Sequence, residues 1–171
     1  MVCLICHSQD TYFDSEAVSL KVSPMSVVWI IGKGPVLKLP SPNAAGSAAS
    51  GVDKNRSYLN YMSVAGSGMR NKITIAIANP NIPNSTFLYV QVDRGNAVQG
   101  TPGIPVTNSW VALSNNPSDL VRGIESCYTG NGPETGHLLK YRWQVSKSEY
   151  NKLVATIGED IVINFTITAD I

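Results

Sequence analysis

Charged residues are scarce in this chain of 171 residues, and the two signs nearly cancel, with 13 Lys and Arg against 12 Asp and Glu. They make up 15% of the chain, whereas about 25% is usual for a globular domain. A protein that binds nucleic acid or anionic lipid by neutralising phosphates needs a basic surface, so this class is excluded. Long surface helices need Glu, Lys and Arg on their wet faces, so a helical bundle is excluded as well.

Long apolar runs and histidines are also lacking. No apolar run approaches the roughly 20 residues that a membrane-spanning helix needs, so the sequence predicts no transmembrane segment. Outside the first nine residues the only histidine is His137, and no Gly-x-Ser-x-Gly motif supplies a serine nucleophile. No cluster of His, Asp and Glu has zinc spacing, and no Asp-rich loop has calcium spacing. We therefore expect a protein that is not an enzyme and holds no metal ion.

Turn formers and small polar residues are abundant: the chain has 14 Gly and 10 Pro, together with 18 Ser, 14 Asn and 10 Thr. A hydrophobic share of 43% is still enough for a packed core. Gly, Pro and Asn gather in short segments such as residues 79–84, 100–105 and 130–133. Segments of this kind separate the strands of β-sandwiches and barrels.

Between these segments, apolar and polar residues alternate, which is the pattern of half-buried β-strands. The clearest example is residues 160–169, where Phe165 and its apolar neighbours alternate with Asn and Thr. Further strands are expected at residues 16–23, 26–31, 36–39, 72–78, 86–92, 109–113 and 137–145, with 26–39 forming a hairpin. Helical signals are limited to a capping box from Ser146 to Glu149 and a turn at residues 117–121. The sequence predicts an all-β, Ig-like antiparallel β-sandwich with one or two short helical turns.

The first nine residues begin with an apolar run that ends abruptly at His7. We interpret residues 1–9 as the remnant of a secretory signal peptide and residues 10–171 as a single β-sandwich domain. This interpretation predicts a protein that is secreted, periplasmic or at the cell surface. If residues 1–9 are removed, Cys127 is the one cysteine left, and we expect it to be a buried, inert thiol.

A second interpretation of the same residues is c-type haem attachment, because Cys3, Cys6 and His7 spell Cys-x-x-Cys-His. The two thiols would bond the haem vinyl groups, His7 would be the proximal ligand, and His137 or a methionine the distal one. Export would remove this motif, and a haem site usually lies between helices, which this chain barely has. We therefore expect no cofactor and keep the haem electron carrier as an alternative.

Three tryptophans, Trp29, Trp110 and Trp143, lie on predicted strands. On the wet face of a sheet they would form a platform on which a sugar ring stacks. Tryptophans in a sandwich of this size belong more often to the core. A carbohydrate-binding module with exposed Trp and Tyr is therefore an alternative function, and a glycan an alternative partner.

From residue 16 onward the chain resembles a group of uncharacterised secreted proteins of Gram-negative bacteria. The matching segments are Tyr58-Leu-Asn-Tyr61, Arg70-Asn-Lys-Ile-Thr74, Asp119-Leu-Val-Arg-Gly-Ile-Glu-Ser-Cys-Tyr-Thr-Gly-Asn-Gly132, Gly136-His137, Tyr141 and Asn164-Phe-Thr-Ile-Thr168. In style it is also distantly similar to fimbrial subunits and the spore coat protein U group, which are Ig-like sandwiches that assemble on surfaces. The paired cysteines of that group have no counterpart here. The resemblance implies an exported sandwich of a Gram-negative bacterium and carries no catalytic residues.

These observations predict a non-enzymatic structural or adhesive protein of the cell surface. An exposed sheet edge, or a detachable N-terminal strand at residues 18–22, would pair with a neighbouring subunit by β-strand addition. The expected partners are other copies of the chain or other surface proteins.

Overall fold

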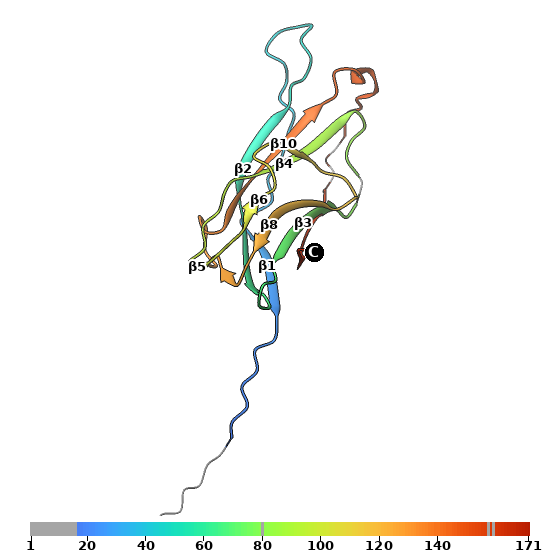
Figure 1. Cartoon of the computed structure of the whole chain (residues 1–171). Coiled ribbons are helices and arrows are strands. Elements are labelled where there is room, and N and C mark those ends of the chain that lie inside the picture. The colour runs from blue at the N-terminus through green and yellow to red at the C-terminus, as the bar shows by residue number, and fades with distance from the viewer. Residues whose placement is uncertain (1–16, 80, 157, 159) are drawn as a thin grey trace, which may run out of the picture.

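The computed structural model describes residues 17–79, 81–156, 158 and 160–171. In this part of the chain nearly all regular structure is β, and the strands form two antiparallel sheets packed as two layers (Figure 1). The large sheet contains β1 (Met25–Ile31), β2 (Val52–Val64), β4 (Thr86–Val92), β5 (Gln99–Gly100), β7 (Val111–Ala112), β9 (Cys127–Tyr128) and β10 (His137–Val145). The small sheet contains β3 (Asn71–Ile77), β6 (Ile104–Pro105), β8 (Ser118–Ile124) and β11 (Ile163–Ala169).

The strand order of the large sheet is β5-β9-β2-β10-β4-β7, and β1 pairs with β2. The order of the small sheet is β11-β3-β8-β6. Alternate side chains of each long strand point between the two layers, because successive residues of a strand face opposite ways. This buried core consists mainly of Leu59, Tyr61, Ile73, Ile75, Ile77, Leu88, Val90, Val92, Leu120, Val121, Ile124, Leu139 and Tyr141. The predicted all-β antiparallel sandwich is confirmed.

Helical structure in the described residues is one 3₁₀ turn, Tyr150–Lys152, which follows the predicted capping box. The turn expected at residues 117–121 is wrong, because these residues enter strand β8. In β8 the residues Leu120 and Val121 are both buried, and the ladder with β3 shifts register at two places. These irregularities interrupt the alternation that identifies a strand in a sequence.

Two predicted strands do not form. Residues 36–39 lie in an irregular segment, so the expected hairpin at 26–39 is absent, and β1 pairs instead with β2. Residues 17–24 have no regular structure although apolar and polar residues alternate along them. Figure 1 shows this segment, in blue, running straight away from the body of the sandwich. We call residues 17–24 the arm.

Candidate functional site

The arm exposes three large apolar side chains at alternate positions. Val18, Leu20 and Val22 are 74%, 91% and 76% exposed. Pro24 follows, and its missing N–H ends any hydrogen-bonded strand between the arm and β1. The arm therefore has the side-chain pattern of a strand but no partner strand within the described residues.

The sandwich has an open strand edge on each sheet at the same side. Within the described residues, β1 pairs only with β2 and β11 pairs only with β3, so each presents an unpaired edge. The two edge strands contact each other across the layers. We call this side of the sandwich the seam. Five apolar residues that border it are only partly buried although they pack against the core: Val28, Ile30, Ile163, Phe165 and Ile167.

The hydrogen bonds of β11 show which of its backbone groups face the seam. The N–H of Ala78 donates to Val162 O, and the N–H of Asp170 donates to Arg70 O, both at 2.8 Å. In the antiparallel register Val162 lies directly opposite Ala78, and Asp170 directly opposite Arg70. Pairs that are hydrogen-bonded in this way recur at every second residue of the two strands. The backbone groups of Ile163, Phe165 and Ile167 therefore point to the open edge, while their side chains point inward.

His137 is fully buried at the start of β10 and both of its ring nitrogens are occupied. Nδ1 lies 2.8 Å from the N–H of Gly95 and 3.0 Å from the carbonyl oxygen of Asp93, and Nε2 lies 2.8 Å from Tyr61 Oη. The Tyr61 hydroxyl donates in turn to the carbonyl oxygen of Pro102. Burial lowers the pKa of His137, while hydrogen bonds to the carbonyls of Asp93 and Pro102 act in the opposite direction. The side chain ties β2, β10 and the loop at residues 93–102 together.

The haem motif Cys3-x-x-Cys6-His7 lies outside the described residues, and so does the predicted signal-peptide remnant. His137, the suggested distal ligand, is enclosed by its own chain as described above. Cys127 is buried, and burial raises the pKa of its thiol to about 11. Among the described residues no three side chains of His, Cys, Asp or Glu gather as metal ligands.

The three tryptophans of the suggested sugar platform do not all lie on one face of the sheet. Trp143 packs against the core, whereas Arg142, the preceding residue of β10, points to the opposite face of the sheet. The Arg142 guanidinium lies 4.2 Å from the centre of the Trp110 ring, so Trp110 is on that outer face and is partly covered. Trp29 belongs to β1, at the seam.

Two adjoining hollows of about 650 and 520 Å³ lie beside the Arg70–Glu125 ion pair. Arg70 pairs with Glu125 at 3.1 Å and Arg122 with Asp170 at 2.9 Å, and Arg94 also lines the second hollow. The arm and the seam are the features with unsatisfied binding capacity, and they form the candidate site.

The apolar row of the arm is visible in the sequence, whereas the open edge of β11 is not. The alternation of residues 160–169 shows a strand, whereas its place at the edge follows from strand order, which the sequence does not show. Comparison of the chain with protein-family models, with curated proteins and with solved structures gave no match. In the part of the chain that the structure describes, no helix is long and apolar enough to span a membrane.

Proposed function

We propose that the protein is a non-enzymatic structural or adhesive subunit of the periplasm or cell surface, and that it assembles by strand addition. The arm of one copy adds as a strand to the sheet of the next. The exposure of Val18, Leu20 and Val22 carries this proposal. Burying three such side chains stabilises an assembly by on the order of 5 kcal/mol, and the isolated chain lacks this stabilisation.

The open edge of β11 suits the arm in two respects. Its free backbone groups belong to every second residue, namely Ile163, Phe165 and Ile167. The apolar residues of the arm have the same spacing of two residues. An added strand satisfies these backbone groups and places its own inward side chains beside theirs. The apolar residues of the arm would then complete the partly buried side of the core.

The outer side of the β11 edge is uncharged. The outward residues of β11 are Asn164, Thr166 and Thr168, which are exposed, uncharged and polar. An edge strand without charge is prone to pair with strands of other chains, so proteins either cover such an edge or pair it with a partner strand. Strand addition between copies is a use of this edge.

The test is the molar mass of the full chain over a concentration series, measured by light scattering after size-exclusion chromatography. We expect oligomers for the full chain and a folded monomer after deletion of residues 10–22. Leu20→Lys gives the monomer as well, because a charge enters the apolar row of the arm. Ser19→Lys, on the opposite side of the arm, is the matched control and keeps the oligomers.

Circular dichroism and a cooperative thermal transition show that each variant retains its fold. A full chain that is monomeric at high concentration contradicts the proposal. Oligomers of unchanged size after the deletion contradict it equally.

A further inference from the structure

The outer surface of β1, β2 and β9 is apolar where the outer face of a sheet is ordinarily polar. In the ladder, Met25 lies opposite Val64, Val27 opposite Met62, and Met62 opposite Tyr128. The intervening residues of these strands, such as Tyr61 and Cys127, are buried between the layers. The apolar outer residues are Met25, Val27, Trp29, Met62, Val64 and Tyr128, which we call the outer patch. Asn60, opposite Trp29, is the polar residue of this face; it is buried and donates to Gly130 O at 2.9 Å.

The outer patch is open to solvent over three strands. Met25 and Val27 are each 49% exposed and Tyr128 is 48% exposed. The paired segments 25–31, 58–64 and 127–128 contain no charged residue. Interface cores are poor in charge and rich in Met, Trp and Tyr, and methionine adapts its shape to a partner. This composition points to a protein surface as the occupant.

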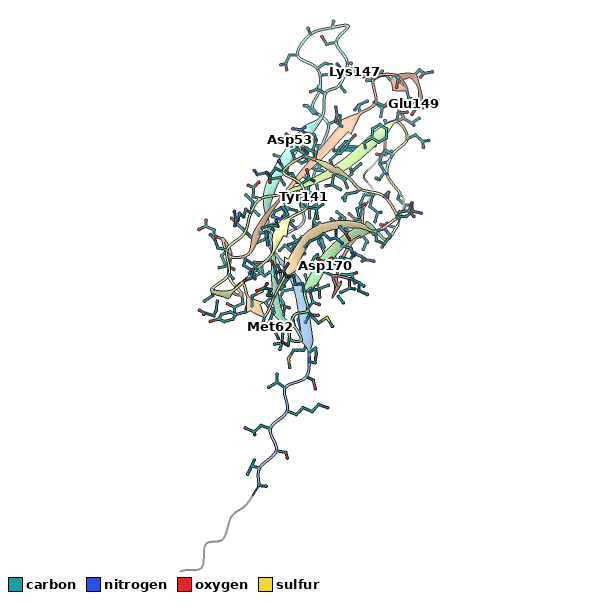
Figure 2. All side chains as sticks on the ribbon, in the orientation of Figure 1. Asp53, Met62, Tyr141, Lys147, Glu149 and Asp170 are labelled. Carbon is teal, nitrogen blue, oxygen red and sulfur yellow. The ribbon has the colours of Figure 1, made fainter. Side chains whose placement is uncertain are left out.

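The proposed strand addition makes that protein a second copy of the chain, because the arm lies beside the outer patch. Pro24, the last residue of the arm, directly precedes Met25, the first residue of β1, and consecutive Cα atoms are about 3.8 Å apart. A neighbour that holds Val22 in its sheet therefore has its body within about 12 Å of Met25, three residues away. Figure 2 shows Met62 at the end of the body from which the arm emerges. The outer patch is thus next to the neighbour that the arm reaches.

We infer that the outer patch is the second part of the contact between subunits and packs against the body of the copy that receives the arm. This inference rests on the proposed strand addition. The arm supplies a strand to the neighbour, and the outer patch fixes the angle between the two sandwiches. A flexible arm alone would leave that angle free, because Pro24 breaks the ladder between arm and body.

The experiment uses two binding measurements that separate arm from body. The first is the dissociation constant between full-length subunits, from sedimentation velocity over a concentration series. The second is the binding of a synthetic peptide of residues 17–24 to the chain with Leu20→Lys, whose own arm is disabled. The peptide has the arm but no body, so it cannot use the outer patch.

We expect Val27→Lys to weaken the association of subunits at least tenfold and to leave peptide binding within twofold. Ile104→Lys is the matched control, because Ile104 is 56% exposed, against 49% for Val27, and lies on β6 of the other sheet. It changes neither measurement. Val27→Lys that leaves subunit association within twofold overturns the inference. A variant that weakens peptide binding as much as subunit association also overturns it, since the residue would then act in strand addition or in the fold.

These outcomes are distinct from failure of the proposed function. If the peptide does not bind and Leu20→Lys leaves the oligomers intact, strand addition itself is wrong and the inference falls with it. If the peptide binds, Leu20→Lys dissociates the oligomers and Val27→Lys is silent, only the outer patch is wrong.

Discussion

The Arg142 side chain donates two hydrogen bonds of 2.7 Å to the carboxylate oxygens of Asp53, across the ladder between β10 and β2. The hydrogen bond from Arg142 holds the pKa of Asp53 below its usual value. The same guanidinium lies on the Trp110 ring. One arginine therefore links three segments of the large sheet on its outer face, and Figure 2 shows Asp53 near the end of the sandwich opposite Met62.

We predict that Arg142→Ala lowers the free energy of unfolding by about 1 kcal/mol, since both groups are partly exposed and water screens the pair. Tryptophan emission moves to longer wavelength because Trp110 loses its cover. Chemical denaturation followed by fluorescence measures both effects. Lys147→Ala, at an exposed position beyond the end of β10, is the control and changes neither. An unchanged emission maximum for Arg142→Ala contradicts the prediction.

The Arg142–Asp53 pair also explains why the longest strand was not predicted from the sequence. The first half of β2 is polar and shows no alternation of apolar residues, so its sequence resembles a loop. It forms a strand because β10 pairs along it and supplies partners such as Arg142. By contrast, β4 and β10 were predicted at the residues where they occur, because every second residue of each strand is apolar and faces the core. Examples are Leu88 and Val90 in β4 and Leu139 and Tyr141 in β10. Alternation identifies strands that are held by burial, and it misses those held by cross-strand polar contacts.

The candidate site was predicted in part for a similar reason. The row Val18, Leu20 and Val22 is visible in the sequence, and it predicted a strand at residues 16–23. That strand is wrong for the isolated chain because no neighbouring strand is present to pair with it. The open edge of β11 depends on strand order, and the separation of Trp110 from Trp143 depends on which face each occupies. Both are properties of tertiary packing.

Tyr61→Phe is expected to destabilise the protein by about 1–3 kcal/mol. The variant removes a buried hydroxyl that donates to the Pro102 carbonyl and lies 2.8 Å from His137 Nε2. Tyr128→Phe removes a hydroxyl from an exposed ring and is the matched control, with an expected change below about 0.5 kcal/mol. Urea unfolding at neutral pH compares the two. Equal effects of the two substitutions would show that the buried hydroxyl contributes no more than an exposed one.

Cys127 is expected to resist thiol reagents until the protein unfolds. Its pKa of about 11 leaves little thiolate at pH 8, and the residue is buried between the two sheets. The measurement is reaction with a disulfide reagent in a chain carrying Cys3→Ser and Cys6→Ser, with and without urea. Adding Ser67→Cys at an exposed turn supplies a fast-reacting control thiol in the same fold. Reaction of Cys127 at the rate of the control thiol would contradict its burial.

His137 is expected to make stability depend on pH on the acid side of neutrality. Burial lowers its pKa in the folded chain, whereas the unfolded chain has a value near 6.5. As pH falls below about 6.5, His137 binds a proton in the unfolded state but stays neutral in the folded state, so the free energy of unfolding decreases. The decrease approaches about 1.4 kcal/mol per pH unit and stops below the folded pKa.

The measurement is the free energy of unfolding in urea between pH 7.5 and pH 4.5 for the wild type and for His137→Gln. The variant is less stable at pH 7.5, because Tyr61 and Gly95 lose their partner, but its stability changes less over this range. The Asp53 carboxylate loses its contribution only at lower pH, since its folded pKa is below its usual value. A wild type and a variant with equal pH slopes between 6.5 and 5 would show that His137 accepts its proton in the folded chain.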